Sequence, residues 1–178
     1  MTDRLRILAN LPSDDGKPTA SVLVPLFEDE AGDLRVVLIK RPDTMPTHAG
    51  HIALPGGRPD PGDRDPIHTA LREAEEEVGI PQDMVKVWGY LPAIHTVEFS
   101  LMVIPVVGLF DRKIELVPSP REVAGIFTPA LSQLAEPDLW VFEVWQGRRV
   151  WFFDLGGELL WGATARILRW LVGLDALP

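Results

Sequence analysis

The segment of residues 56–80, GGRPDPGDRDPIHTALREAEEEVGI, constrains the fold of this chain more than any other stretch of its sequence. It opens with a glycine pair and a loop rich in proline, glycine and aspartate, which indicates a tight turn. Apolar residues then recur at helical spacing, at Ile67, Ala70, Leu71, Ala74 and Val78. Gly79 and Pro81 stand where a helix would end. We therefore expect a helix over Ile67–Val78 that packs through one face and follows a glycine turn.

The same helix carries three glutamates on one side. At about 100° per residue, Glu73, Glu76 and Glu77 project within roughly 100° of one another. Glu75 lies about 160° away from Glu73 on the same wheel. Converging carboxylates repel one another unless a cation lies between them. Because a hard divalent ion such as Mg²⁺ prefers oxygen ligands and commonly brings a phosphate substrate, the three glutamates predict a metal site.

Acidic runs are also common on solvated helix faces, and Arg72 with Glu76 makes an ordinary i,i+4 ion pair. The glycine turn and the R-E-x-x-E-E-x-G spacing favour the metal site over this alternative. The pattern resembles the Nudix hydrolase box, G-x5-E-x7-R-E-U-x-E-E-x-G-U, where U is aliphatic. The matching residues are Arg72, Glu73, Ala74, Glu76, Glu77, Gly79 and Ile80. One extra loop residue places Gly57 at the box glycine and Asp63 at the box glutamate.

The resemblance to Nudix hydrolases implies a fold and a chemistry. The implied fold is α/β, an α/β/α sandwich around a mixed central sheet. The implied reaction is hydrolysis of a diphosphate that joins two organic groups, with Mg²⁺ or Mn²⁺ held by Glu73, Glu76 and Glu77. The carbonyl oxygen of Gly57 is a further candidate ligand, since glycine lets the backbone approach closely. Arg72 is expected to orient the neighbouring carboxylates by bidentate hydrogen bonding.

A second segment, residues 36–57, indicates the substrate. Its sequence, VVLIKRPDTMPTHAGHIALPGG, is similar to the segment that marks the coenzyme A diphosphatase branch of the Nudix hydrolases. Arg41, Gly50 and Pro55-Gly56-Gly57 match that segment, whereas Pro42 and Pro46 replace its usual serine and arginine. The resemblance implies that coenzyme A is cleaved to 3′,5′-ADP and 4′-phosphopantetheine.

Further site residues are expected around these two segments. Arg41, Gly56, Gly57 and Arg58 are candidates for contacting the substrate, and Lys40 is a weaker one. The alternative for Arg41 is an ordinary charge at the end of a strand. Glu122 stands where the branch has a Glu-Val pair and is the candidate general base. A second candidate base is Glu98, for which a plain surface role is the favoured interpretation.

Composition limits the remaining possibilities. We expect one domain over residues 1–178, with residues 1–19 as a lead-in, because the length suits a single core. No apolar run approaches 18 residues, so no membrane partner is expected. The net charge of −9 argues against binding nucleic acid. The absence of cysteine excludes disulfides and thiol catalysis. A cytoplasmic enzyme with a small-molecule partner is expected, and its oligomeric state stays open.

The order of expected elements is mixed. A closing helix is predicted over Trp161–Leu171, and a hairpin turn at Gln146-Gly147-Arg148. The expected strands are Ser21–Glu28, Leu34–Lys40, His51–Leu54, Lys86–Leu91, Leu101–Phe110, Gly125–Phe127, Trp140–Trp145 and Arg149–Phe153. The four histidines lack metal-ligand spacing, and the six tryptophans are interpreted as core residues, in preference to a shelf on which adenine would stack.

Two other functions fit the same pattern. The chain could hydrolyse another nucleoside diphosphate derivative, such as ADP-ribose, NADH or a dinucleoside polyphosphate. It could also be a binding protein that has lost catalysis. The intact R-E-x-x-E-E set argues against the binding protein, because a binder has no need for four converging charges.

Overall fold

The computed structural model describes residues 19–44, 48–96 and 101–176, so Glu98 lies outside the described residues. Its largest sheet is mixed, with strand order β2 (Leu34–Val36), β1 (Thr19–Glu28), β8 (Leu101–Leu109) and β6 (Lys86–Tyr90). The central pair, β1 and β8, is parallel, and the outer strands run antiparallel to their neighbours. Two short strands, β5 (Gly56–Gly57) and β7 (Ile94–Thr96), pair with β1 and β8.

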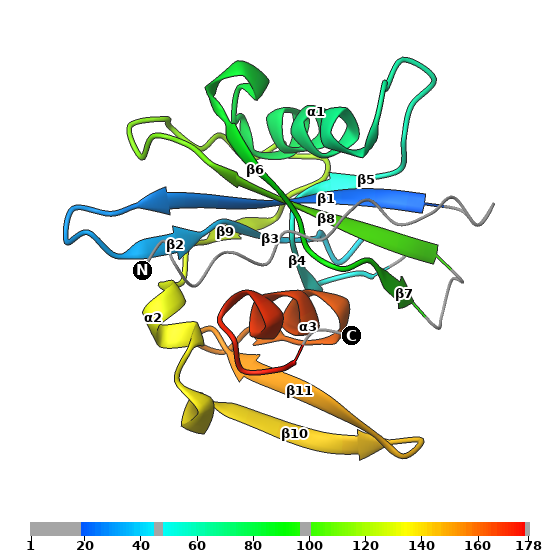
Figure 1. Ribbon diagram of the computed structural model, residues 1–178, viewed down its shortest axis with the longest axis vertical. Helices are drawn as coiled ribbons and strands as arrows, with labels where there is room; N and C mark the ends of the chain where they lie inside the picture. Colours follow the sequence, from blue (N-terminus) through cyan, green and yellow to red (C-terminus); the bar gives the residue numbers. More distant parts are fainter. Residues whose placement is uncertain (1–18, 45–47, 97–100, 177–178) are drawn as a thin grey trace.

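The central strands are buried on both faces because helices cover both sides. Their sequences, TASVLVPLFE and LMVIPVVGL, are nearly continuous apolar runs, as expected for a parallel pair. Figure 1 shows α1 (Pro66–Val78) on one side of the sheets and α3 (Gly162–Leu171) on the other. The expected α/β arrangement of a mixed sheet between helices is therefore confirmed.

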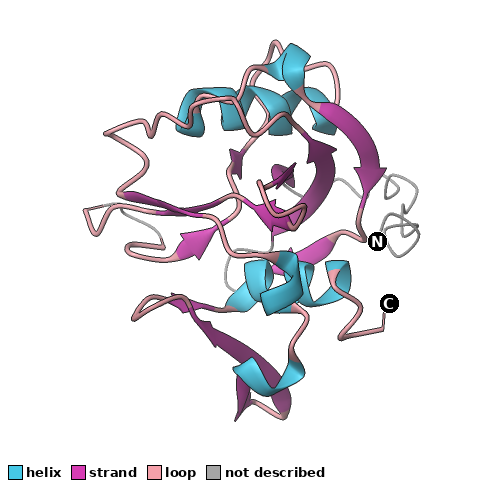
Figure 2. Cartoon of the chain, turned by 90° about the vertical axis from the view of Figure 1, so that its left-hand side faces the viewer, coloured by secondary structure: helices cyan, strands magenta, loops and turns pink. Residues whose placement is uncertain are grey.

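The single strand expected over Leu34–Lys40 is wrong, because the chain changes sheets at Val37. The Val37 N–H donates to the Pro25 carbonyl oxygen at 2.9 Å. Before it, β2 pairs with β1; after it, β3 (Leu38–Lys40) pairs with β4 (Ile52–Ala53) and β9 (Gly125–Phe127). This switch carries Lys40 away from the edge of the largest sheet. The strands consequently curl between the helices, as Figure 2 shows.

Both ends of α1 are fixed by local chemistry. The Asp65 side chain accepts from the His68 N–H at 2.8 Å, and Pro66 occupies the first helical position. At the other end Gly79 adopts a left-handed conformation with φ 74°, and its N–H donates to the Glu75 carbonyl. Ala70, Ala74 and Val78 are buried against β1, as the apolar spacing predicts. The caps thus fix where the helix begins and ends, and its buried face fixes its rotation about its own axis.

The last part of the chain forms a hairpin and the closing helix. Strands β10 (Trp140–Trp145) and β11 (Arg148–Asp154) meet at Gln146 and Gly147, whose φ angles are 50° and 75°, which suit a primed two-residue turn. Strand β12 (Leu159–Leu160) completes this sheet, which projects beyond α3 in Figure 1. The remaining short elements are η2 (Gln82–Met84), α2 (Leu131–Leu134) and η3 (Pro137–Leu139). No helix in the described residues could span a membrane.

Candidate active site

The glycine turn and α1 meet at Glu77. The Gly56 N–H donates to Oε2 of Glu77 at 2.9 Å, and the Glu77 side chain is buried, with 3% of the residue exposed. Gly56 itself pairs with Val22 of β1. A β-carbon at Gly56 would collide with the Ser21 carbonyl oxygen and the Val22 backbone. Only glycine therefore lets β5 lie between β1 and α1 at this point.

Glu73 faces the second glycine of the same turn. A β-carbon at Gly57 would overlap the Glu73 carboxylate. The absence of a side chain at Gly57 thus leaves the room that the carboxylate occupies. Glu73 and Glu77, one helical turn apart, both point toward the Gly56–Gly57 strand.

Arg72 links the loop before α1 to the carboxylates on the helix. Its Nε and Nη2 donate to the two Asp63 carboxylate oxygens at 3.0 Å each, and the Asp63 side chain is 2% exposed. Nη2 also donates to Glu73 Oε1 at 2.9 Å and to the Arg58 carbonyl at 3.2 Å. Nη1 donates to Glu76 Oε2 at 3.0 Å. The expected orienting contacts of Arg72 are present, and Asp63 lies where the loop acid was predicted.

Glu76 departs from the expected convergence of three glutamates. Its side chain is 54% exposed and turns toward Arg72, an i,i+4 partner. Within the described residues, no three acidic or histidine side chains are already gathered closely enough to hold a metal ion. The structure thus brings Glu73 and Glu77 together and leaves Glu76 at their edge. Glu75 lies outside the group, as expected, and accepts from the Gln82 side chain at 2.7 Å.

Burial shapes the electrostatics of this pair. Burial raises the pKa of Glu77 to about 8; the negative charges of Glu73 and Glu122 add to the rise, while the Gly56 N–H and the Arg41 charge oppose it. Burial also raises the pKa of Glu73, against the lowering effect of Arg72. Two carboxylates that resist ionisation together are stabilised in their charged forms by a cation. Their hard oxygen donors fit a divalent ion such as Mg²⁺ or Mn²⁺.

A distant loop brings Glu122 to the same place. The Ser119 N–H donates to the Glu77 carbonyl at 2.8 Å, and the Val117 N–H donates to the Val78 carbonyl at 3.0 Å. These bonds fasten the loop to the end of α1. The charge of the exposed Glu122 consequently acts on both Glu73 and Glu77.

Arg41, which follows β3 directly, brings a positive charge to the site. The positive charge of Arg41 reaches Glu77, and its buried Nε has no hydrogen-bond partner within the described chain. The Arg41 N–H donates to the His51 carbonyl at 3.0 Å, which fixes its backbone. Lys40 Nζ lies 2.5 Å from Glu158 Oε1. Arg58 contacts Arg72 through its backbone carbonyl, so its predicted role in substrate binding stays a prediction.

A family model described as the NUDIX domain matches residues 17–153. This span contains the glycine turn, α1 and the Glu122 loop. The chain belongs to the Nudix hydrolase family. Members of this family act on pyrophosphate bonds.

Curated Nudix relatives support this membership. Nudix hydrolase 22, chloroplastic, of Arabidopsis thaliana is 41% identical over 84% of this chain and 52% of its own length. The Nudix hydrolase NudL of Photorhabdus laumondii is 40% identical over 88% of this chain and 84% of its own length. The chain therefore spans about half the length of the plant relative and most of the bacterial one.

Solved Nudix structures share the fold. The Nudix hydrolase RenU of M. smegmatis has a TM-score of 0.56 and 23% identity, and the alignment covers 67% of this chain and 74% of RenU. The Nudix hydrolase of Alicyclobacillus acidocaldarius has a TM-score of 0.58 and 17% identity, and the alignment covers 88% of this chain and 91% of that protein. At these identities the likeness concerns the fold alone.

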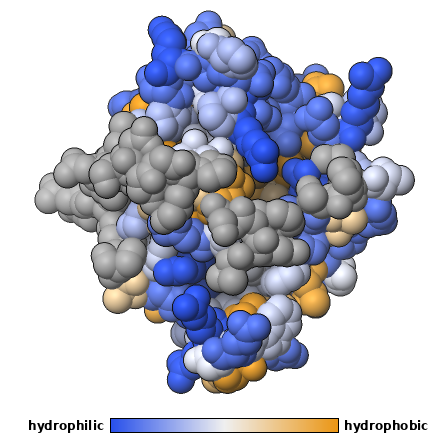
Figure 3. All heavy atoms as spheres, turned by 90° about the vertical axis from the view of Figure 1, so that its right-hand side faces the viewer, coloured by the Kyte–Doolittle hydropathy of each residue, from blue (hydrophilic) through white to orange (hydrophobic). Residues whose placement is uncertain are grey.

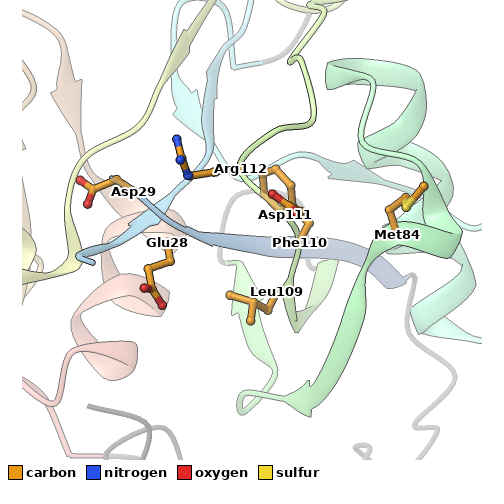
Figure 4. Close-up of a pocket in the computed structure, with 7 residues that line it drawn as sticks. All are labelled: Glu28, Asp29, Met84, Leu109, Phe110, Asp111 and Arg112. Atoms are coloured by element: carbon orange, nitrogen blue, oxygen red, sulfur yellow. The ribbon is translucent and has the colours of Figure 1, made fainter. Parts of the chain in front are cut away.

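A hollow of this Nudix domain lies away from α1 and the glycine turn. It opens at the far end of β1 and is lined by residues of β1, β8 and η2 and the loops beside them, among them Glu28, Asp29, Asp111 and Arg112 (Figure 4). Ser21, which pairs with Gly57, precedes Glu28 by seven residues, or about 23 Å of extended strand. This hollow contains none of the predicted site residues.

Sequence reasoning missed the residues that assemble the Nudix site from a distance. Ser119 and Val117 act through backbone N–H groups, and any residue other than proline could supply these bonds. His68 Nδ1 accepts from the Arg64 N–H at 3.3 Å and lies 3.2 Å from Asp63 Oδ1, so its ring packs beside the loop acid. His68 is the third residue of the helix, three residues after the capping residue Asp65, and this spacing was the signal that the sequence offered.

Proposed function

We propose that this Nudix hydrolase cleaves the diphosphate bond of coenzyme A, with Mg²⁺ or Mn²⁺, to give 3′,5′-ADP and 4′-phosphopantetheine. One observation carries the hydrolytic part: the buried carboxylate of Glu77 and the half-buried one of Glu73 face a backbone turn in which only glycine fits. The choice of coenzyme A rests on the similarity of residues 36–57 to the coenzyme A diphosphatase segment.

Glu73, Glu76, Glu77 and the Gly57 carbonyl would hold the divalent ion. When bound, the ion neutralises the diphosphate and lowers the pKa of a water molecule. Glu76 would reach this set by giving up its contact with Arg72, which costs little because the Glu76 side chain is exposed. Arg72 keeps its bidentate pairing with Asp63 and continues to orient Glu73.

The other residues of the site bind the substrate and move a proton. Arg41 offers a guanidinium whose buried Nε has no hydrogen-bond partner among the described residues, and a phosphate oxygen is the natural acceptor for it. Arg58, which follows the glycine turn, is the second cation proposed to contact the substrate. Glu122, whose charge acts on Glu73 and Glu77, would take a proton from the attacking water.

The test is a substrate panel with purified protein and Mg²⁺ or Mn²⁺. The panel contains coenzyme A, ADP-ribose, NADH and diadenosine tetraphosphate. The last is included because a C. elegans protein of the same fold is an Ap4A hydrolase, and ADP-ribose because the NrtR Nudix domain of Shewanella oneidensis is complexed with it. Products are separated by anion-exchange chromatography.

We expect the highest kcat/KM for coenzyme A, with no turnover in a chelator and recovery when Mg²⁺ is returned. A higher kcat/KM for ADP-ribose or for the dinucleotide contradicts the proposed substrate but keeps the hydrolase. Binding without cleavage of any of the four compounds would instead identify a non-catalytic binding protein.

A further inference from the structure

Trp161, the residue before α3, lies at the centre of a group of aromatic rings. Its ring centroid is 4.8 Å from that of His51, 5.7 Å from that of Trp145 and 6.1 Å from that of Phe152. The Phe152 and Trp161 rings are stacked, with an interplanar angle of 23°. These four residues, called here the aromatic cluster, come from β10, β11, the start of α3 and the loop before β4.

The aromatic cluster is not part of the hydrophobic core. Side chains alternate between the two faces of the β10–β11 hairpin. One face packs on α3 through Trp140 and Phe153, which are both buried. Trp145 and Phe152 point to the opposite face, and Trp145 is 46% exposed. On the side of the molecule shown in Figure 3, hydrophobic residues are visible among hydrophilic ones at the lower end, where Figure 1 places the hairpin.

The aromatic cluster adjoins the catalytic groups through the chain around Arg41. The Arg41 N–H donates to the His51 carbonyl, and the Arg41 charge reaches Glu77. Gly56 is the fifth residue after His51, so their backbones lie within about 18 Å of each other. On the other side, Lys40 is ion-paired with Glu158, three residues before Trp161. Arg41 thus links the backbone beside the aromatic cluster to the buried carboxylate of Glu77, and Lys40 links β3 to the loop before Trp161.

We propose that the aromatic cluster is a stacking platform for the nucleobase of the substrate. The proposal rests on the proposed function, because it places the base of a nucleoside diphosphate derivative beyond the phosphates that Arg41 and the carboxylates receive. An exposed tryptophan face stacks on any planar base, and such stacking strengthens binding severalfold or more. The edge-on contacts of Trp161 with His51 and Trp145 hold the platform in place.

Trp145 and Phe142 provide a matched pair of variants. They lie on opposite faces of β10 and are equally exposed, at 46% each. Binding of adenosine monophosphate is measured by calorimetry for the wild type, Trp145→Ala, Trp145→Phe and Phe142→Ala. We expect Trp145→Ala to weaken binding roughly tenfold, Trp145→Phe to restore most of it, and Phe142→Ala to have no effect. Ribose 5-phosphate, which lacks the base, should bind all four proteins alike.

Three results overturn the platform. The first is unchanged binding of adenosine monophosphate by Trp145→Ala. The second is equal weakening by Phe142→Ala, which would show a general effect of the hairpin. The third is an effect of Trp145→Ala on titration with 4′-phosphopantetheine but not with adenosine monophosphate, since the cluster then receives the other arm of the substrate. These titrations need no turnover, so they test the platform independently of the hydrolase. If only the hydrolase proposal fails, cleavage is absent but binding of adenosine monophosphate still depends on Trp145.

Discussion

The Gly56 N–H donates a hydrogen bond of 2.9 Å to Oε2 of Glu77, a carboxylate that the fold otherwise buries. This bond joins β5 to α1 and holds the carboxylate beside the glycine turn. One neutral N–H does not replace the hydration of a carboxylate, and the pKa of Glu77 is accordingly raised to about 8. The fold keeps Glu77 in a place where it is unfavourable without a cation, which is the expected condition of a metal ligand.

Glu77→Gln should therefore remove activity while keeping the fold. The amide oxygen can accept the same bond from Gly56, but the charge that attracts a divalent ion is lost. Mutation of a residue that only supports a metal ligand typically lowers metal affinity or activity about 10- to 100-fold. Because Glu77 is the proposed ligand itself, we expect kcat to fall by more than about 100-fold. Glu75→Gln is the control, because Glu75 is on the same helix and faces away from the site. Steady-state rates near the wild-type value for Glu77→Gln would contradict its assignment as a ligand.

The stability of the metal-free protein should fall between pH 4.5 and pH 8. Glu77 has an ordinary pKa of 4.5, and in the folded protein burial raises it to about 8. The native state therefore binds more protons than the unfolded state in this range, and stability decreases as the pH rises through it. We expect a loss on the order of 2–4 kcal/mol from this group, measured by urea unfolding in chelator.

Glu77→Gln separates this effect from other titrations. Glutamine has no charge to lose, so the variant should lack the Glu77 part of the pH dependence and be more stable than the wild type at pH 8. Equal slopes of unfolding free energy against pH in both proteins would count against burial as the cause.

The helix and its glutamates were predictable because local spacing decides them. The apolar period determines which face of α1 is buried, and Gly79 ends the helix at the expected residue. Gly57 and Asp63 were found from the same segment, since the loop places both against α1. These contacts join residues that are close in the sequence, so the local sequence is enough to predict them.

Long-range contacts decided what the sequence could not show. The change of sheets at Val37 depends on the Pro25 carbonyl oxygen of a neighbouring strand. The outward turn of Glu76 is different, because its pair with Arg72 is a local i,i+4 contact that the sequence also offered. The interpretation of every tryptophan as core is wrong for Trp145, which is 46% exposed. Its position follows from how the hairpin lies on the body, which periodicity does not determine.

Gly57→Ala should lower activity more than stability. The new methyl group would overlap the Glu73 carboxylate and displace it from the turn. Overpacking of this kind costs about 1–3 kcal/mol, and displacement of a ligand should reduce kcat by at least about tenfold. Gly62→Ala is the control in the same loop, because a β-carbon there would meet no atom within 4 Å. If Gly57→Ala matched Gly62→Ala in kcat and in thermal unfolding, Gly57 would not be needed to accommodate Glu73.

Asp63→Ala should destabilise the fold and disturb the site together. Asp63 is 2% exposed and receives two hydrogen bonds from Arg72, so its removal leaves that guanidinium without its main partner. We expect a loss of about 2–3 kcal/mol and a kcat lower by roughly 10- to 100-fold. Asp60→Ala is the control, because Asp60 is 68% exposed and 3.8 Å from Arg72.

The ion pair of Asp63 with Arg72 should make the free energy of unfolding depend on pH in the acidic range. The Arg72 guanidinium holds the pKa of Asp63 below its ordinary value of 3.8, so the contribution is complete above pH 3.8 and is lost as the pH falls further. Wild type and Asp63→Ala should therefore converge in unfolding free energy at low pH. A constant difference down to the acid transition would contradict the ion pair as its source.

Glu122→Gln should test the proton acceptor. The Glu122 loop is fastened to α1 by the bond from Ser119 to the Glu77 carbonyl, so the variant keeps its backbone position. Loss of a general base typically costs 10²–10⁴-fold, and the acidic limb of the plot of kcat against pH should disappear with it. Glu115→Gln, an exposed change in the preceding part of the loop, should leave both rate and profile unchanged. If the acidic limb persists in Glu122→Gln, the general base is another group. Glu122 would then act on Glu73 and Glu77 through its charge alone.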